Sequence, residues 1–196
     1  MTEAQVFILS DKTLEKVIQQ IKPHQWDETV PAEITPRQPG LSLRQIINYH
    51  AYDEAWVPDV LAGKTIEEVG DKYDGDQLGE DPAASYARLV ALAVKAVESA
   101  DLDRSVHLSY GDFTARDYLK HITSFRTLRA YDIARFIGVD PTLPEELVHG
   151  FWDELVPDVE EWRKLGVYGP KVEVPADAPL QSKLLGLTGR DPNAKA

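Results

Sequence analysis

The sequence contains no cysteine, and this absence removes several classes of chemistry at once. Without thiol side chains the chain cannot form disulfides, bind a metal through thiolates or attack a substrate with a cysteine of its own. A thiol that took part in a reaction would have to come from a cofactor. Several well-known enzyme motifs are missing as well: the sequence has no GxGxxG, no Walker loop, no GxSxG elbow and no HExxH pair.

Positive charge and long apolar runs are also scarce. The chain has 21 lysines and arginines against 33 aspartates and glutamates, a net charge of −12. Nucleic-acid binding needs a basic surface, so we expect no nucleic-acid partner. No segment approaches the roughly 20 apolar residues of a membrane span, and the N-terminal stretch MTEAQVFILSDK has no basic region before a long apolar run. We therefore expect a cytoplasmic protein without membrane contact.

What the sequence does contain is a series of amphipathic helices. Apolar residues recur at helical spacing in five segments: Gln5 to Ile21, Leu43 onward after an N-cap at Ser42, Pro82 onward, Thr114 to Gly138, and Pro144 to Gly166 with a bend at Pro157. The weak alternation of SVHLSYGDF predicts a short strand or hairpin. The pattern predicts one all-α domain over residues 1–196, an up-and-down four-helix bundle with an additional C-terminal helix and short extended segments.

Two of the predicted helices carry charged residues on the face that should be buried. In the fourth helix the apolar face places Arg129 at its centre and Arg126 just inside its edge. In the second helix His50 and Glu54 lie one turn apart on the apolar face, and Asp53 lies at its margin. The apolar face of the fourth helix is defined by Tyr118, Ile122, Phe125, Ile133 and Phe136; Asp132 follows Arg129 by three residues, and His121 precedes it by eight on the same side.

An unpaired buried charge costs several kcal/mol, so these groups are expected to have partners. One interpretation is a buried ion-pair network around Arg129, with Glu54 and Asp132 as acceptors and His50 as a further hydrogen-bonding partner. A second is a polar cavity in which an anionic ligand meets the arginines. A third is a metal site.

Four segments together resemble a known family: LRQIINYHAYDEAWV, YGDFTARDYL, RAYDIARFIGVDP and GVYGPKVEVPADAPLQSKLLGLTGRDP. They are similar to the actinobacterial branch of the DinB-like superfamily, which includes the metal-binding domain of mycothiol-dependent maleylpyruvate isomerase. The resemblance implies a DinB-like helical bundle. It also implies a divalent metal held by a histidine on the second helix and by two residues four apart on the fourth. In such a site the metal binds the thiol mycothiol and favours its thiolate form.

This chain departs from the family pattern at the metal site. His50 matches the second-helix ligand, but Phe125 and Arg129 stand at the two fourth-helix positions. Phenylalanine has no donor atom and the guanidinium stays protonated, so neither binds a cation. We therefore expect a degenerate site with His50 as the only family ligand retained, in which Arg129 supplies the lost positive charge with Glu54 and His50 as partners. A rival hypothesis keeps a metal in a displaced site formed by His121, His50 and Glu54.

Two functions follow as expectations. The first is a mycothiol-dependent transferase or isomerase that acts on a small electrophile, with Arg126 or Arg129 stabilising the thiolate. The second is a non-catalytic DinB-like bundle that binds a small anionic ligand or a partner chain; a second copy of the chain is left open as a partner. No residue is assigned a catalytic role, and the expected pocket residues are His50, Asp53, Glu54, His121, Arg126, Arg129 and Asp132.

Overall fold

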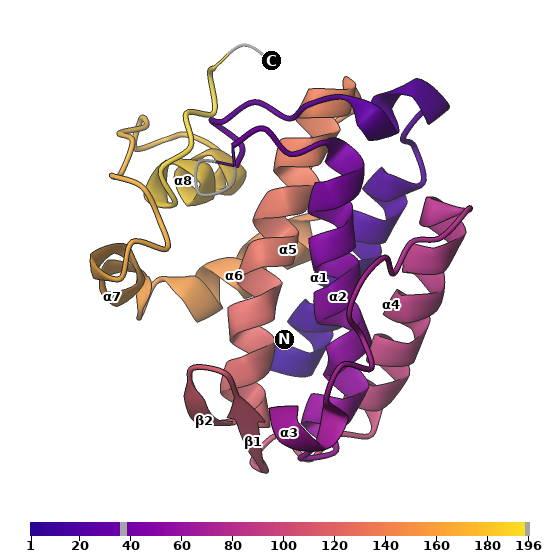
Figure 1. The fold of residues 1–196 in the computed structure, drawn as a ribbon. Coiled ribbons are helices and arrows are strands. Elements are labelled where there is room, and N and C mark those ends of the chain that lie inside the picture. Colours follow the sequence, from indigo (N-terminus) through magenta and orange to yellow (C-terminus); the bar gives the residue numbers. More distant parts are fainter. Residues whose placement is uncertain (36–38, 195–196) are drawn as a thin grey trace.

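The computed structural model describes residues 1–35 and 39–194 and is predominantly helical (Figure 1). Four long helices lie side by side: α1 (Glu3–Ile18), α2 (Leu43–Leu61), α4 (Pro82–Glu98) and α5 (Ala115–Ile137). α2 packs on α4, α4 on α1, and α1 on α5, so that backbones approach closely along three sides. On the fourth side α2 and α5 face each other. The prediction of a mainly α fold is confirmed.

Local signals place the starts of α2, α4 and α5 and the end of α5 where the sequence predicts them, whereas α1 begins two residues and ends three residues before the predicted Gln5 to Ile21. The Ser42 hydroxyl accepts a hydrogen bond from the Gln45 backbone N–H and the Gln45 side chain accepts one from the Ser42 N–H, a complete capping box at the start of α2. Thr114 caps α5, and Gly138 ends it with a φ of 75°, a conformation that favours glycine. Pro58 lies inside α2 without interrupting it.

The order of the helices differs from a strictly alternating up-and-down bundle. α2 and α4 run parallel: Arg44 near the start of α2 donates to the Gly79 carbonyl just before α4, while Arg104 beyond the end of α4 lies against Gly63 beyond the end of α2. The long connection of residues 62–81, which contains α3 (Ile66–Val69), carries the chain back to the starting end. The directions are therefore up, down, down and up. The prediction of an up-and-down bundle did not anticipate the parallel pair, because helical periodicity carries no information about direction.

The smaller elements surround the bundle. A two-stranded antiparallel hairpin, β1 (Ser105–Leu108) with β2 (Gly111–Thr114), lies at the end where α5 begins, and confirms the predicted hairpin. The predicted fifth helix is divided into α6 (Glu145–Leu155) and α7 (Val159–Lys164), with the break at Pro157, whose ring carries no N–H donor. A 3-10 turn, η1 (Pro23–Asp27), follows α1, and α8 (Leu180–Leu187) lies near the C-terminus.

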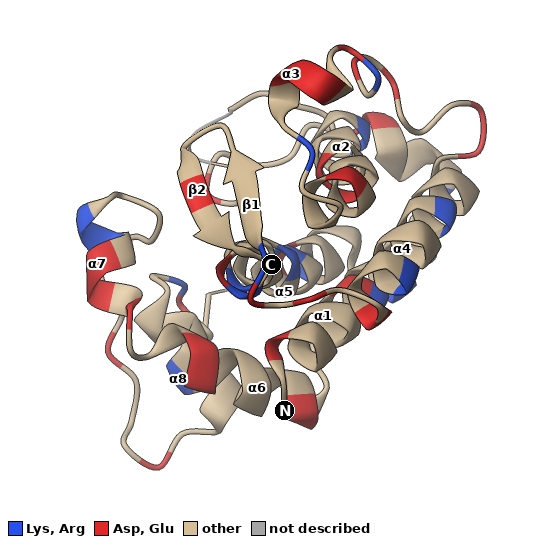
Figure 2. Ribbon diagram, turned by 90° about the horizontal axis from the view of Figure 1, so that it is seen from below, with Lys and Arg blue, Asp and Glu red and all other residues tan. Residues whose placement is uncertain are grey.

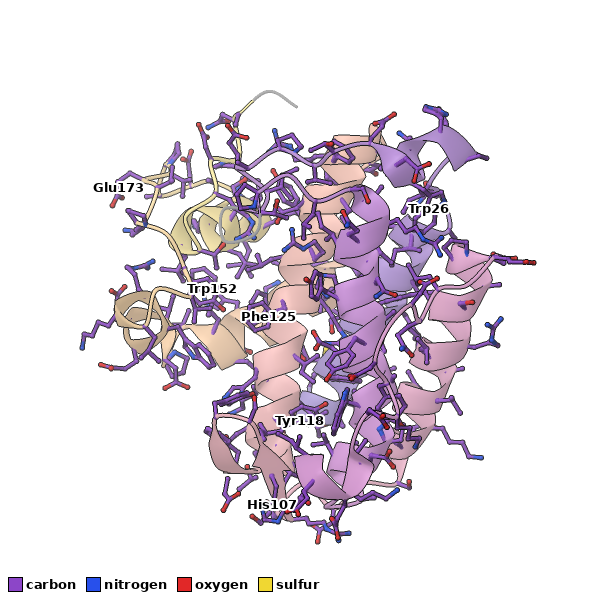
Figure 3. All side chains as sticks on the ribbon, in the orientation of Figure 1. Trp26, His107, Tyr118, Phe125, Trp152 and Glu173 are labelled. Atoms are coloured by element: carbon purple, nitrogen blue, oxygen red, sulfur yellow. The ribbon has the colours of Figure 1, made fainter. Side chains whose placement is uncertain are left out.

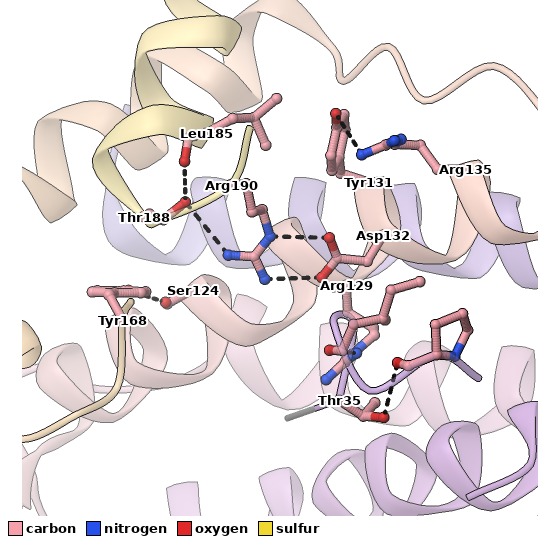
Figure 4. A network of polar contacts seen from close by, with 12 residues as sticks. Thr35, Ser124, Arg129, Tyr131, Asp132, Arg135, Tyr168, Leu185, Thr188 and Arg190 are labelled. Atoms are coloured by element: carbon pink, nitrogen blue, oxygen red, sulfur yellow. Dashed lines mark hydrogen bonds and ion pairs between the residues drawn. The ribbon is translucent and has the colours of Figure 1, made fainter. Parts of the chain in front are cut away.

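The C-terminal segment is fixed to α5 by charge pairing. Arg190 donates through Nε and Nη2 to the two carboxylate oxygens of Asp132, at 3.0 and 2.8 Å (Figure 4). Asp132 therefore neutralises Arg190. The ion-pair interpretation, which made Asp132 an acceptor for Arg129, is wrong on this point. Within residues 1–35 and 39–194 no helix combines the length and apolar character that crossing a membrane requires.

Candidate functional site

The buried charge cluster of the bundle is centred on Arg126. Its guanidinium is 1% exposed and forms ion pairs with Asp11 of α1, at 2.6 Å from Nε to Oδ1, and with Glu54 of α2. Both carboxylates are 0% exposed, and the Tyr86 hydroxyl donates to Glu54. The expectation that Arg129 pairs with Glu54 is therefore wrong. Arg126 points into the space between α1, α2 and α4, where it meets carboxylates from two helices.

Two carboxylates on one guanidinium create a proton-binding site in the core. Burial and the neighbouring Glu54 charge raise the pKa of Asp11 well above its usual range, against the opposing effect of Arg126. Burial disfavours the charged guanidinium, but the charges of Glu54 and Asp11 outweigh this effect and raise the pKa of Arg126. Arg126 is thus held as a cation, and its surroundings favour the protonated form of Asp11.

Arg129 lies one turn further along α5 and has different partners. Its Nε–H donates to His50 Nε2 at 3.2 Å, and its Nη1 donates to the Ile34 carbonyl at 3.0 Å. A guanidinium only donates, so His50 Nε2 is the acceptor and the imidazole proton resides on Nδ1. Burial, followed by the charges of Arg129 and Arg126, lowers the pKa of His50 and keeps the ring neutral. The lone pair that would bind a metal is therefore used by Arg129.

The displaced metal site is not formed. His121 lies at the hairpin end of α5, where its Nδ1 is 3.1 Å from the Tyr110 hydroxyl and its ring contacts Phe113 and Trp162. His50 and Glu54 are not its neighbours. In the part of the chain that the structure describes, no three His, Cys, Asp or Glu residues are grouped so that they could hold a metal ion. The residues at the family position, with Phe125 and Arg129 beside His50, do not fit a divalent ion either.

A cavity of about 270 Å³ lies between α2, α3, the hairpin and the first half of α5. Aromatic rings form much of its wall: Tyr52, Trp56, Tyr110, Tyr118 and Phe125, together with the aliphatic side chains Val60, Ile66, Leu108 and Ile122. In Figure 3 Tyr118 and Phe125 project from α5 above His107 of the hairpin. The mouth is unusually apolar for a surface, since Ile66, Tyr110 and Phe125 are 46%, 61% and 46% exposed.

Phe125 is therefore not the core residue that the helical projection predicts. It lines the cavity and is half exposed at its mouth. A helical projection identifies apolar positions but does not distinguish a packed core from the wall of a cavity. Tyr118, Ile122 and Ile133 of the same predicted face are buried.

The polar residues of the cavity wall are Asp53, His107, Ser109 and His121, and none of the arginines or lysines in residues 1–35 and 39–194 lines it. Asp53 lines the cavity and is exposed to solvent there. The protein packed around its carboxyl raises the pKa to about 6; the Arg126 charge opposes this effect and the Glu54 charge adds to it. Burial also lowers the pKa of His121. The expected meeting of an anionic ligand with the arginines is not supported, because neither Arg126 nor Arg129 reaches this cavity.

Of the seven expected pocket residues, the structure places only Asp53 and His121 in the cavity wall. Glu54 and Arg126 belong to the buried cluster, His50 and Arg129 to the neighbouring pair, and Asp132 to the contact with the C-terminal segment. Asp11 was missed, although its spacing from Phe7, Leu14 and Ile18 puts it in the apolar stripe of α1. The helical projection used for the other two helices would have found it.

Comparisons with models of protein families, with curated proteins and with solved structures find no match for this chain. The resemblance to the DinB-like superfamily accordingly rests on the sequence segments named above, and the function is inferred from the geometry of the cavity.

Proposed function

We propose that this chain is a DinB-like bundle without the family's metal centre, and that it binds a small, largely apolar molecule in the aromatic cavity. The observation that carries the proposal is the cavity itself, which is lined by five aromatic side chains and open at a mouth formed by exposed apolar residues. A cavity of about 150 Å³ is enough to bind benzene. The volume of about 270 Å³ therefore has room for an aromatic ring with a short substituent.

The driving force for binding is the removal of apolar surface from water. Burial of apolar surface contributes roughly 25 cal/mol per Å². Both the ligand and the exposed rings of Tyr110 and Phe125 would lose contact with water. Apolar surface of the protein therefore adds to the favourable free energy of binding, together with that of the ligand. Ligand pockets are commonly concave, mostly apolar and equipped with a few polar groups, and this cavity has that composition.

The contact between His50 and Arg129 is the reason why we propose a site without a metal ion. The His50 Nε2 lone pair accepts from Arg129, and Phe125 offers no ligand atom. A test is to express the protein with added zinc and nickel and to measure bound metal by elemental analysis. We expect far less than one equivalent in the wild type. The double variant Phe125→His/Arg129→His restores imidazoles at both positions and should gain zinc; stoichiometric metal in the wild type would refute this part of the proposal.

Ligand binding is tested with 2-phenylethanol as the probe, followed by amide chemical shifts in ¹⁵N-labelled protein. Shifts should concentrate on residues of α2, α5 and the hairpin that line the cavity. Phe125→Ala should weaken binding because it removes a ring from the mouth, and Leu165→Ala is the matched control, since Leu165 is a 74% exposed apolar residue outside the cavity. An absence of saturable shifts, or equal losses in both variants, would contradict the proposal.

A thiol-dependent transferase or isomerase remains the second candidate. It is favoured by the two titratable residues, Asp53 and His121, that face an otherwise apolar cavity, where groups with shifted pKa values often take part in proton transfer. The expected role of Arg126 in stabilising a thiolate has no geometric basis, because two carboxylates already neutralise it. Turnover of maleylpyruvate with added mycothiol, abolished in Asp53→Asn, would favour this candidate over a binding protein.

A further inference from the structure

We propose that the ligand of the aromatic cavity is a small amine, bound as its ammonium ion against the carboxylate of Asp53 and the surrounding ring faces. This inference rests on the proposed function and names the chemical class of the ligand. Two features of the cavity wall point to a cation: its negative charge, which comes from one unpaired carboxylate, and its aromatic surface.

The formal charge of the wall is negative. In the part of the chain that the structure describes, Asp53 is the one acidic residue that lines the cavity, and no lysine or arginine lines it. The hairpin that covers one side carries an acidic band at Asp112 and no basic residue in either strand, as Figure 2 shows. The nearest guanidinium, that of Arg126, is already shared by Asp11 and Glu54. A ligand in this cavity therefore meets excess negative charge.

The Asp53 carboxylate has no partner among the residues that the structure describes, in contrast to its neighbours on α2. Glu54 is paired with Arg126, and Asp59 is paired with Lys64 and Lys72 at 2.8 Å each. The Asp53 side chain is exposed at the cavity wall, so its carboxylate is accessible to a ligand and receives no counter-charge from the described residues. An ammonium ion in the cavity would supply both the missing charge and hydrogen-bond donors.

The other titratable groups around Asp53 do not supply a competing cation. His121, on α5, shares a hydrogen bond with the Tyr110 hydroxyl, and burial lowers its pKa. His107, on β1, is paired with Asp112 at 2.7 Å. The remaining groups that face Asp53 are the phenol groups of Tyr110 and Tyr118 and, behind it on α2 and α5, Glu54 and Arg126.

The apolar wall also suits a cation. Five aromatic rings line the cavity, with Tyr52 and Trp56 on α2 opposite Tyr118 and Phe125 on α5. The face of an aromatic ring carries partial negative charge and attracts an ammonium ion, most strongly at tryptophan. An aliphatic wall of the same size would accept neutral molecules equally well but would make no cation–π interaction with an ammonium ion.

Three probes of similar size separate the possible outcomes: 2-phenylethylamine as the cation, 2-phenylethanol as the neutral analogue and 3-phenylpropionate as the anion. Calorimetric titration at pH 7.5 should give the amine a Kd lower than that of the alcohol by about tenfold, as expected for one additional charged hydrogen bond. The anion should bind more weakly than the alcohol.

Asp53→Asn is the decisive variant, because it keeps the shape of the side chain and removes its charge. The amine should fall to the affinity of the alcohol, while the alcohol itself binds unchanged. Asp177→Asn is the matched control, since Asp177 is exposed in the segment before α8 and does not line the cavity. Phe125→Leu tests the ring independently: it keeps an apolar side chain at the mouth and should weaken the amine more than the alcohol.

The outcomes also separate this inference from the proposed function. If the alcohol binds and the amine binds no more tightly, or if the anion binds best, the amine inference is overturned while the cavity remains a binding site. If none of the three probes binds, the proposed function fails with it. If Asp53→Asn leaves the preference for the amine intact, Asp53 is not the recognition residue and the inference is overturned.

Discussion

Replacement of Arg126 by methionine tests the central packing feature of the bundle. Among the described residues, Arg126 is the one counter-charge of two carboxylates that are 0% exposed, Asp11 and Glu54; methionine removes this charge and fills most of the vacated volume. Breaking a buried ion pair by removal of one partner typically costs about 3–5 kcal/mol. Because Asp11 already has a raised pKa, its protonation limits the cost. We expect a loss of about 3–5 kcal/mol in the free energy of unfolding at pH 7.

The measurement is urea-induced unfolding followed by far-UV circular dichroism, with the m-value used to check that the transition keeps its cooperativity. Arg129→Met is the matched control on the same helix. Arg129 has no carboxylate partner and makes two hydrogen bonds, to His50 and to the Ile34 carbonyl, so its loss should cost only about 1–2 kcal/mol. The order of the two losses is the sharper test, because a sequence-based assignment of the central role to Arg129 predicts the reverse.

A double variant separates charge from packing. If the penalty of Arg126→Met comes from an unpaired buried carboxylate, then Arg126→Met/Glu54→Leu should be more stable than Arg126→Met alone, since both charges leave together. A loss below about 1 kcal/mol in Arg126→Met, or a double variant less stable than the single one, would refute the reasoning.

Three further predictions concern other titratable or charged groups. The affinity of the wild type for 2-phenylethylamine should rise as the pH is raised from 5 to 8, because the carboxyl of Asp53, with a pKa of about 6, must ionise to bind it; a flat calorimetric profile would contradict this. The pKa of Glu154 is raised from 4.5 to about 8 by burial and by the Glu3 charge, so the folded state binds more protons than the unfolded state and stability falls as the pH rises through this window. Glu154→Gln should therefore raise the melting temperature at pH 9 and have no such effect at pH 4. Arg190→Ala removes the bidentate pair with Asp132 and should cost about 1–2 kcal/mol, with faster amide hydrogen exchange in α8; unchanged exchange would mean that the C-terminal segment is held by other contacts.

The positions of the helices followed from the sequence because their signals are local. A cap such as Ser42 and a terminal glycine such as Gly138 act within one turn, and apolar periodicity reports burial without reference to any other segment. The same locality explains what was missed. The division of the fifth helix depends on a proline whose effect, bend or break, is decided by packing, and the parallel course of α2 and α4 depends on the route of residues 62–81.

The exchange of roles between Arg126 and Arg129 has a more specific cause. A single apolar stripe describes a helix that is buried on one face, but α5 contacts α1, α6 and the hairpin and is buried on most of its circumference. On such a helix the centre of an apolar stripe is not the most buried direction. Thr123, Thr127 and Ala130, small residues that allow close approach, mark the side of α5 that is fully buried, and Arg126 lies beside them.

The side of the bundle between α2 and α5 explains why the cavity lies where it does. The two helices run antiparallel there, so residues later in α2 lie opposite residues earlier in α5. His50 contacts Arg129, and Glu54 contacts Arg126. At these two levels long charged side chains close the gap. At the next level, toward the hairpin, Val60, Tyr118 and Ile122 line the cavity. The next arginine of α5, Arg116, lies beyond this level and pairs with Glu3 and Asp103, so the gap stays open as the cavity. A third arginine in this series, at position 122, would extend the closed levels by one turn. Ile122→Arg should therefore abolish binding of 2-phenylethanol and 2-phenylethylamine alike, whereas Asp53→Asn should affect only the amine.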